Sequence, residues 1–524
     1  MRTLLASAQA RAHSVPAQAM FHLSATCFMA NTDENLGESA ANHETNETGE
    51  TGALASLLAA YSGLLAVPGL PPPLVLMPPL DVAAVAPVPE IRVGFGQAAC
   101  LQPQGPDRLT RLAQDGQALL SALIDLRSSD AQSAPAPCLY GALQFQPLPA
   151  TAASTTEPTA TAQAAGAATA WAGLPDAHFV LPRWLLRLRG RQGFLQLAVR
   201  ACELADPTAL LAELALIEAA LQRPSPADPV VTAAQAAGAV AAAGADAQAA
   251  AAWRDLVGQA LDQIAQGALD KVVLARVQTA QRGDGQGFDV ATALRQLGQA
   301  YPACLRFALP LADATFLGAT PELLVERIGD TVRCDALAGS RPWLATGESA
   351  EQAGQALLAD DKEAREHAYV VAAIRDRLQV HGALTASRDP TLRVLRNVVH
   401  LWTPISATLR QPVHILALLA DLHPTPAVCG VPQANAAAFI VEREALPRGY
   451  YAAPIGWFDA QGHGAFFVAI RSALLRGDRA WLFAGAGIVA GSDPDRELRE
   501  TAAKLRPMLG ALGLSDPVPQ RIRA

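Results

Sequence analysis

The stretch Gly485-Ala486-Gly487-Ile488-Val489 is followed by Gly491-Ser492-Asp493-Pro494 and then by the segment from Asp495 to Lys504. This order of residue types predicts a buried strand, a glycine turn and a helix. Asp493 is suited to cap the N-terminus of that helix, and Pro494 is suited to its first position. Because Glu497 and Glu500 are three residues apart, they are expected to share one face of the helix.

Two adjacent carboxylates repel each other unless a cation or a proton lies between them. Hard oxygen ligands of this kind suit Mg²⁺, which usually takes one or two carboxylates and keeps several waters. The alternative is a solvated helix on which Glu500 pairs with Lys504, an arrangement that is common on exposed helices. Taken alone, this stretch favours the solvated helix, so the choice depends on the rest of the chain.

The composition is that of a globular protein with a large core. The 524 residues are enough for one large or two ordinary domains, and their hydrophobic content is 51%. The net charge is −8 and no basic tract occurs, so nucleic acid is not an expected partner. The seven cysteines are dispersed without a CxxC pair, which predicts reduced thiols in a cytoplasmic protein. No apolar run has the length and character of a membrane span.

The chain divides by composition into four parts. Residues 1–52 are polar and patternless, and we expect a disordered, dispensable leader. Residues 53–250 are expected to form the N-terminal portion of the fold. Residues 251–514 show the clearest strand and helix patterns, and residues 515–524 are expected to form a flexible tail. The many short strands between helical patterns predict an α+β fold with extensive antiparallel sheet and helices outside.

Two low-complexity segments interrupt the N-terminal portion. Residues 149–170 are rich in Ala and Thr without a core pattern, which predicts a surface insertion. Residues 223–250 are first Pro-rich and then Ala-rich, which predicts a linker between the two halves of the chain.

Two ionisable residues stand in apolar strand patterns. Lys271 precedes Val272-Val273-Leu274, and such a lysine either snorkels to the surface or is desolvated with a lowered pKa suited to base chemistry. Glu322 follows Thr320-Pro321 and precedes an apolar strand. It either faces water at an edge or is partly buried with the raised pKa that a general acid needs. For each residue alone, the solvent-facing alternative is favoured.

Three further motifs have both an ordinary and a functional interpretation. Glu363 and Glu366 open a helix, where acids also belong because they face the positive end of its dipole. The turn Ala338-Gly339-Ser340 is able to present backbone N–H groups to an anion. Arg471 lies in an apolar pattern that predicts a strand, and it suggests a buried anion partner because an arginine is costly to bury alone.

Taken in order, these motifs resemble those of the chorismate-utilising enzymes, and among them the isochorismate synthases. The resemblance covers about Trp253 to Leu509 and includes His400-Leu401 and His423-Pro424-Thr425-Pro426-Ala427. The N-terminal half matches more loosely. The resemblance implies two large, packed antiparallel β-sheets with helices outside, and it makes residues 251–514 the chorismate-binding catalytic domain.

The resemblance also implies roles for individual residues. Glu366 and Glu500 would hold Mg²⁺, with Glu497 alongside through a water. Lys271 would be the base that activates water, and Glu322 would be the acid. The residues implied to bind substrate are Ala338, Gly339, Ser340, His400, Tyr451, Arg471, Gly485, Gly487 and Lys504.

The implied activity is the Mg²⁺-dependent, reversible isomerisation of chorismate to isochorismate, in which water attacks C2 and the C4 hydroxyl is lost. Relatives that add ammonia usually lack the lysine at position 271, whereas salicylate synthases keep it. A salicylate synthase and a non-catalytic chorismate-binding relative therefore stay open as alternatives. The resemblance implies a monomer without a glutaminase subunit, and it leaves menaquinone, siderophore and salicylate pathways open.

Overall fold

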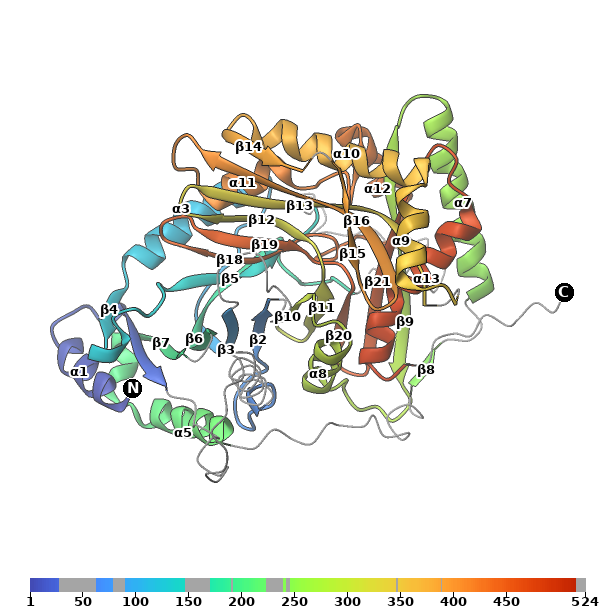
Figure 1. The fold of residues 1–524 in the computed structure, drawn as a ribbon. Helices are drawn as coiled ribbons and strands as arrows, with labels where there is room; N and C mark the ends of the chain where they lie inside the picture. The colour runs from blue at the N-terminus through green and yellow to red at the C-terminus, as the bar shows by residue number, and fades with distance from the viewer. Residues whose placement is uncertain are drawn as a thin grey trace, which may run out of the picture.

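The computed structural model describes residues 1–27, 63–78, 90–146, 170–189, 192–222, 239–241, 246–344, 347–387 and 389–514. Its strands form two layers that are joined by one long strand, β6 (Ala177–Arg189). The first residues of β6 pair with one layer, while its later residues pair within the other. The strands are therefore continuous in hydrogen bonding although they are arranged as two packed sheets (Figure 1).

The first layer contains the strand that opens with Lys271. Its hydrogen-bonded neighbours follow in the order β4 (Ile124–Arg127), β1 (Met20–Cys27), β7 (Gln192–Arg200), β6, β3 (Glu90–Leu101), β2 (Leu74–Met77), β10 (Leu305–Pro310), β11 (Thr315–Thr320), β20 (Ser472–Arg476), β21 (Arg479–Val489) and β9 (Lys271–Arg282). The short strands β17 (Gly430–Val431) and β8 (Ala239–Ala241) pair with the two ends of β9. All of these pairs are antiparallel except β1 with β4.

The second layer carries the small-residue turn and the strand that opposes it. It runs in the order β5 (Cys138–Leu143), β18 (Pro454–Asp459), β19 (Gly464–Val468), β12 (Leu323–Ile328), β13 (Thr331–Pro342) and β16 (Val398–Leu409). The strands β14 (Gly382–Ala386) and β15 (Thr391–Val394) pair with successive parts of β16.

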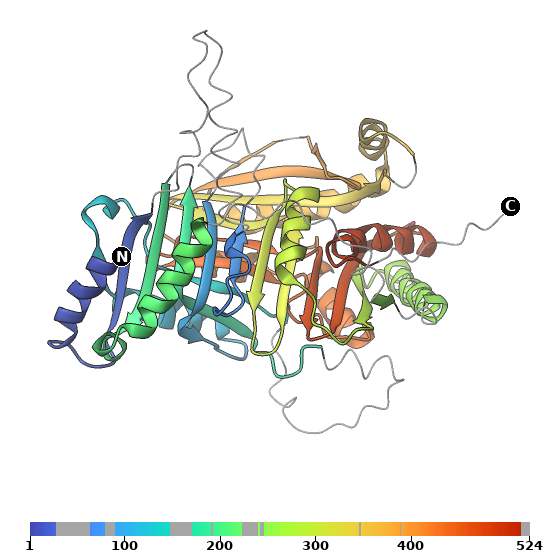
Figure 2. The same cartoon turned by 90° about the horizontal axis from the view of Figure 1, so that it is seen from below.

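Helices cover the outer faces of both layers. Those on the first layer are α1 (Arg2–Ala12), α5 (Thr208–Gln222), α8 (Val290–Ala300) and α13 (Pro494–Ala511) (Figure 2). Those on the second layer are α3 (Arg108–Ser121), α10 (Asp361–Leu378) and α11 (Ile415–Leu422), with α9 (Ala350–Leu358) at the end of β16. The helices α7 (Asp246–Ala265) and α12 (Gln433–Arg443) pack beside β9.

The core is divided between the two faces of the first layer. In β10, Phe307 points into the cluster shared by the two layers, whereas Ala308 points into the cluster under the outer helices. Phe316 and Leu317 of β11 divide in the same way. Successive side chains of a strand point to opposite faces, so a strand buried on both sides is apolar throughout. This explains the continuous apolar runs in the sequence.

The predicted disordered leader is wrong for its first 27 residues. Residues 2–12 form α1, and Met20–Cys27 form β1 between β4 and β7. Phe21 and Leu23 are fully buried. The sequence Met-Phe-His-Leu-Ser-Ala-Thr-Cys has no clear polar alternation because both faces of β1 are covered. Residues 28–52 of the expected leader lie outside the described residues, as do nearly all of the insertion at 149–170 and the tail at 515–524.

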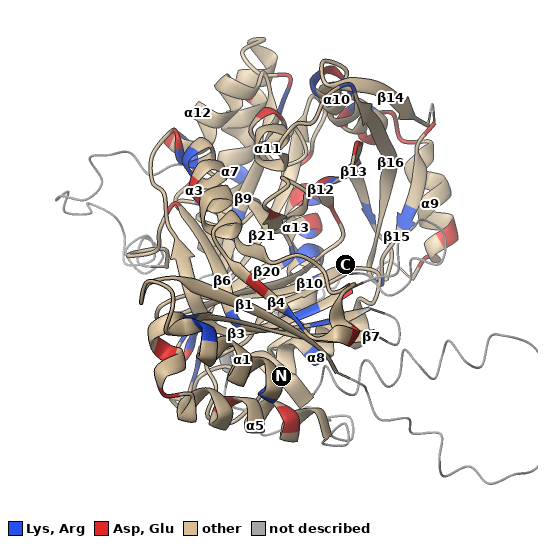
Figure 3. Cartoon of the chain, turned by 90° about the vertical axis from the view of Figure 1, so that its left-hand side faces the viewer, with Lys and Arg blue, Asp and Glu red and all other residues tan. Residues whose placement is uncertain are grey.

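Part of the predicted linker forms regular secondary structure. Of residues 223–250, the structure describes β8 and the first turns of α7, which begins at Asp246 and so earlier than the linker was expected to end. Among the described helices, none has the length and apolar character needed to cross a membrane. In the view of Figure 3, acidic and basic residues both occur on many of the described helices and strands.

Candidate active site

The strand, turn and helix predicted at residues 485–504 are confirmed. Asp493 caps α13, since its Oδ1 accepts a hydrogen bond of 2.7 Å from the Arg496 N–H, and Pro494 is the first residue of the helix. The turn is closed by the Val489 N–H, which donates to Ser492 Oγ. Val489 pairs with Lys271 across β21 and β9. The strand register therefore brings the buried lysine close to the acidic first turns of α13.

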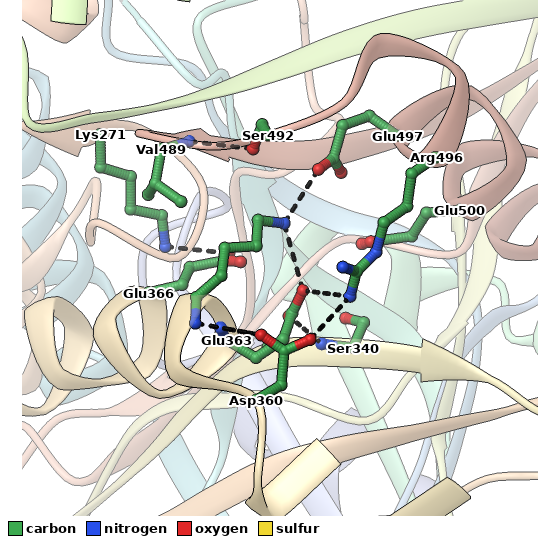
Figure 4. A network of polar contacts seen from close by, with 12 residues as sticks. Lys271, Ser340, Asp360, Glu363, Glu366, Val489, Ser492, Arg496, Glu497 and Glu500 are labelled. Carbon is green, nitrogen blue, oxygen red and sulfur yellow. Dashed lines mark hydrogen bonds and ion pairs between the residues drawn. The ribbon is translucent and has the colours of Figure 1, made fainter. Parts of the chain in front are cut away.

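Lys271 is fully buried, so the snorkelling alternative is wrong. Its Nζ lies 3.1 Å from Glu366 Oε1 (Figure 4). Burial lowers the pKa of Lys271, and the Glu366 carboxylate opposes that change. A lysine whose pKa is lowered in this way can supply a neutral amine, as proton abstraction requires.

Glu366 projects from α10, whose N-terminus is capped by Asp360. Burial favours the neutral acid, but Lys271 and Lys362 outweigh it and hold the pKa of Glu366 below its ordinary value. Gly487 of β21 leaves room for this carboxylate, because a Cβ at position 487 would lie 2.1 Å from Glu366 Oε1. The glycine is therefore required by the close approach of the acid.

Four carboxylates gather where α10 meets α13: Glu363, Glu366, Glu497 and Glu500. All four are buried. Burial and the neighbouring carboxylates raise the pKa values of Glu363 and Glu497 to about 7. Lys362, Arg496 and the Ser340 N–H donate to Glu363, which closes a polar network across the two helices and β13 (Figure 4). Glu500 pairs with Lys504, as the solvated-helix alternative expected, although both side chains are largely buried.

The donor set fits a hard divalent cation. Carboxylate oxygens are the ligands that Mg²⁺ prefers, and one or two of them are sufficient. Glu497 Oε2 is buried and makes no hydrogen bond within the described part of the chain, so one oxygen of the cluster is free to coordinate. No group of three or more His, Cys, Asp or Glu side chains in the described ranges has a preformed metal-binding arrangement. The cluster offers carboxylate oxygens, of which Mg²⁺ needs only one or two.

Glu322 is 3% exposed, so the water-facing alternative is wrong for this residue as well. It lies between β11 and β12, and its N–H donates to Thr320 Oγ1. Burial, followed by the nearby Asp335 carboxylate, raises the pKa of Glu322 to about 8. At neutral pH the carboxyl group therefore holds a proton that it can donate.

The turn Ala338-Gly339-Ser340 is a bulge within β13 where the strand faces His400 of β16. Gly339 has a φ of +75°, which is a conformation that glycine adopts readily. The neighbouring Ser340 Oγ lies 2.9 Å from His400 Nδ1. Burial, and then the charge of Arg471, lower the pKa of His400 well below its ordinary value, so the ring is neutral.

Arg471 is buried but does not lie in a strand, which corrects the sequence-based expectation. It occupies the bend between β19 and β20 with a φ of +51°. A non-glycine residue in this region is strained by about 1–3 kcal/mol. Its guanidinium donates to His400 Nε2 at 3.1 Å. Since Nε2 accepts this bond, the proton of His400 is on Nδ1.

Tyr451 and Lys504 complete the wall opposite β13. The Tyr451 ring stacks on Phe483 with centroids 5.3 Å apart, and burial raises the pKa of its hydroxyl to about 12. Lys504 Nζ donates to the Gly485 carbonyl at 3.1 Å. A Cβ at position 485 would lie 3.0 Å from the Tyr451 hydroxyl, so this glycine also keeps space open.

One small cavity of about 50 Å³ unites most of these groups. The sequence-predicted residues that line it are Glu322, Ala338, Gly339, Ser340, Glu366, His400, Tyr451, Arg471, Gly485, Gly487 and Lys504. Lys271 and Glu500 are linked to this wall through their pairs with Glu366 and Lys504. Glu497 does not line the cavity, and its ion-pair partner Lys362 does not line it either.

Sequence reasoning gave no role to two residues that hold the site together. Lys362 bridges Glu363 and Glu497. Arg448 is buried at the cavity wall, donates to the carbonyls of Val428 and Val273, and pairs with Glu444. The helical (i, i+4) rule could not have predicted the Glu444–Arg448 pair, because both residues follow the end of α12 at Arg443.

Comparison with known proteins gives the family. Residues 88–513 match the family described as "Chorismate binding enzyme". The chain is 44% identical over 274 residues to the salicylate biosynthesis isochorismate synthase of Pseudomonas aeruginosa, a match that covers 51% of this chain and 56% of the relative. It is 42% identical over 262 residues to isochorismate synthase MenF of Bacillus subtilis, covering 50% and 55%. The chain thus spans about half the length of these curated relatives.

Solved structures support the same fold. The menaquinone-specific isochorismate synthase MenF of Escherichia coli superimposes with a TM-score of 0.67 at 22% identity, covering 98% of this chain and 99% of that one. Anthranilate synthase component I of Streptococcus pneumoniae gives a TM-score of 0.59 at 20% identity, covering 82% and 93%. The chain belongs to the family of chorismate-binding enzymes. The predicted α+β fold with two packed sheets is confirmed.

Proposed function

We propose that this protein is an isochorismate synthase, which converts chorismate to isochorismate reversibly and depends on Mg²⁺. The observation that carries the proposal is that a fully buried lysine, Lys271, and a second buried ionisable residue, Glu322, belong to the same site. Lys271 lies against a cavity-lining carboxylate, and Glu322 lines the same cavity. Burial shifts both pKa values towards the neutral amine and the neutral acid. A base and an acid of this kind can act on one substrate at the same time.

The neutral amine of Lys271 accepts a proton from water as the water oxygen forms a bond to C2 of the ring. The ring double bonds shift, and the bond between C4 and its hydroxyl oxygen breaks. Glu322 donates its proton to that oxygen, which leaves as water. One water enters and one water leaves, so the reaction is an isomerisation, and no covalent bond to the protein forms.

Glu366 and Glu500 are the residues that would hold Mg²⁺, with Glu497 alongside through a water. Bound there, the metal would neutralise the ring carboxylate of chorismate. The hard oxygen donors and the buried, unbonded Glu497 Oε2 support this assignment.

Substrate binding is assigned to the opposite wall of the cavity. Arg471 and Tyr451 would bind the enolpyruvyl carboxylate, helped by backbone N–H groups near Gly485 and Gly487. The bulge at Ala338-Gly339-Ser340 would line the side of the ring carboxylate, and His400 would approach the ring. The cavity of about 50 Å³ is small for a ten-carbon dicarboxylate, so we expect side chains of its lining to shift when the substrate enters. The seven free thiols further support a cytoplasmic location.

The test is a separation of products. Purified protein is incubated with chorismate and Mg²⁺, and the products are separated by chromatography at early times. Isochorismate as the first product is the expected result. Salicylate with pyruvate as the only early products would identify a lyase, and anthranilate formed with added ammonia would identify an aminating enzyme. Absence of any product while chorismate still binds would identify a non-catalytic relative.

A further inference from the structure

Lys362 is the second residue of α10, and its ammonium lies between carboxylates from two different helices. Nζ lies 3.1 Å from Glu363 Oε1 of α10 and 2.9 Å from Glu497 Oε1 of α13. The side chain of Lys362 is 10% exposed, and each glutamate side chain is 1% exposed. Lys362 is therefore a buried ionic link between the two helices that carry the acidic cluster.

The cations of the cluster are not equivalent. Lys271 pairs with Glu366, Lys504 pairs with Glu500, and Glu363 has a second cationic partner in Arg496. Glu497 differs, because Lys362 is its one ion-pair partner among the described residues and its Oε2 makes no hydrogen bond there. Lys362 is thus the one ammonium within ion-pair distance of Glu497 in the described part of the chain.

We propose that Lys362 is an internal competitor of Mg²⁺ at Glu497, so that metal binding requires the ammonium to withdraw from Glu497 while it keeps Glu363. The inference rests on the Mg²⁺ site of the proposed function. Lys362 acts here as a positioning residue, since it reaches the reacting atoms only through the carboxylates it holds.

The physical reason is charge. An ammonium repels a divalent cation that approaches the same carboxylate, and the low polarity of the interior strengthens this repulsion. Without the ammonium, the four carboxylates repel one another and attract a metal more strongly. Lys362 therefore stabilises the metal-free protein and weakens Mg²⁺ binding by the same interaction, as linkage requires.

The experiment compares wild type with Lys362→Met, a chain of similar length without charge. Mg²⁺ alone is titrated into each protein by calorimetry, and melting temperatures are recorded with and without saturating Mg²⁺. Lys362→Met should melt about 3–5 °C lower than wild type without metal, because two buried carboxylates lose their partner. The Lys362→Met protein should bind Mg²⁺ at least about tenfold more tightly than wild type, and saturating Mg²⁺ should raise its melting temperature by more.

Arg496→Met is the matched control. Arg496 also lies on α13 and pairs with Glu363 and Asp360, but its side chain is 40% exposed and forms no hydrogen bond or ion pair with Glu497 among the described residues. Its Mg²⁺ affinity should stay within about threefold of wild type, because exposed charges are screened. If Lys362→Met does not yield folded protein without metal, Lys362→Gln, which keeps a hydrogen-bond donor, is measured against the same criteria.

The outcomes separate the two claims. If wild type binds Mg²⁺ and the Lys362 variants bind it with equal or lower affinity, the competition is wrong while the proposed function stands. If Arg496→Met tightens Mg²⁺ binding as much as Lys362→Met does, the affinity depends on the total positive charge near the carboxylates. The specific role proposed for Lys362 is then wrong. If wild type neither binds Mg²⁺ nor is stabilised by it, the proposed metal site itself fails.

Discussion

Lys271 Nζ and Glu366 Oε1 lie 3.1 Å apart in an interior where the lysine is wholly shielded from water. The two residues come from β9 and α10, which are far apart in the sequence. The same carboxylate reaches the cavity and lies against Gly487 of β21. One glutamate therefore connects the proposed base to the proposed metal site.

Replacing Lys271 with alanine should lower kcat by about 10²–10⁴, the usual loss for a general base. Substrate affinity should change much less, because Arg471 and the metal site are assigned to binding. Lys271→Met, which keeps most of the side-chain volume, should show the same loss and would assign it to the amine. Steady-state kinetics with circular dichroism as a folding control measures this. A Lys271→Ala enzyme with a near wild-type rate would remove the base assignment.

Glu322 should make the stability of the protein depend on pH. Its pKa is raised from 4.5 to about 8, so the folded chain holds a proton that the unfolded chain has already lost between these values. Stability contributed by this group is therefore present below pH 4.5 and lost as the pH rises through 8. Glu322→Gln, which cannot ionise, should be more stable than wild type at pH 9 by on the order of 3–5 kcal/mol and similar at pH 4.

Thermal melts of both proteins from pH 4 to pH 9 measure the Glu322 effect. A stability difference that does not change with pH would show that the carboxyl group does not titrate as proposed. Glu322→Gln should also lose activity at every pH in this range, because an amide cannot donate the proton that the leaving hydroxyl needs.

Gly487→Ala should damage the site while the fold survives. The added Cβ would lie 2.1 Å from Glu366 Oε1, and the flexible end of that side chain can move aside. Displacing the carboxylate should weaken Mg²⁺ activation by about 10–100-fold, the usual effect of disturbing the support of a metal ligand. Gly258→Ala in α7 is the control, since its Cβ would meet nothing within 4 Å. Equal Mg²⁺ dependence in both variants would contradict the assigned geometry.

The N-terminal strand should be essential to stability. Phe21 is fully buried in β1, and Phe21→Ala should cost about 3–5 kcal/mol of unfolding free energy, as buried phenylalanines usually do. Arg11→Ala at the exposed end of α1 is the control and should change stability by less than about 0.5 kcal/mol. Denaturant unfolding of both variants measures the difference. A protein that lacks residues 1–27 and melts like wild type would show that β1 is dispensable.

Features that depend only on a few neighbouring residues could be predicted from the sequence. Asp493 and Pro494 marked the start of α13 because capping depends on adjacent residues. Lys271 stood out as a charge in an apolar strand and Glu322 as a charge just before one, although only the structure shows that both are buried. The resemblance to a family was needed to favour their functional interpretation.

The features that sequence reasoning missed depend on distant partners. β1 is held by β7 and β4, which follow it by more than 95 residues, so its own pattern could not reveal its burial. Lys362 meets Glu497 only because α10 and α13 pack together, and nothing near Lys362 in the sequence indicates that contact. The bend at Arg471 has a positive φ that its apolar neighbours did not predict.

The most direct test of the account is the source of the new hydroxyl oxygen. Wild-type protein is incubated with chorismate and Mg²⁺ in ¹⁸O-labelled water, and the isochorismate formed at early times is examined by mass spectrometry. Attack by water at C2 predicts one ¹⁸O atom in each product molecule, and Lys271→Ala should abolish its formation. Unlabelled isochorismate would mean that the hydroxyl moves within the substrate, which would contradict water activation by Lys271.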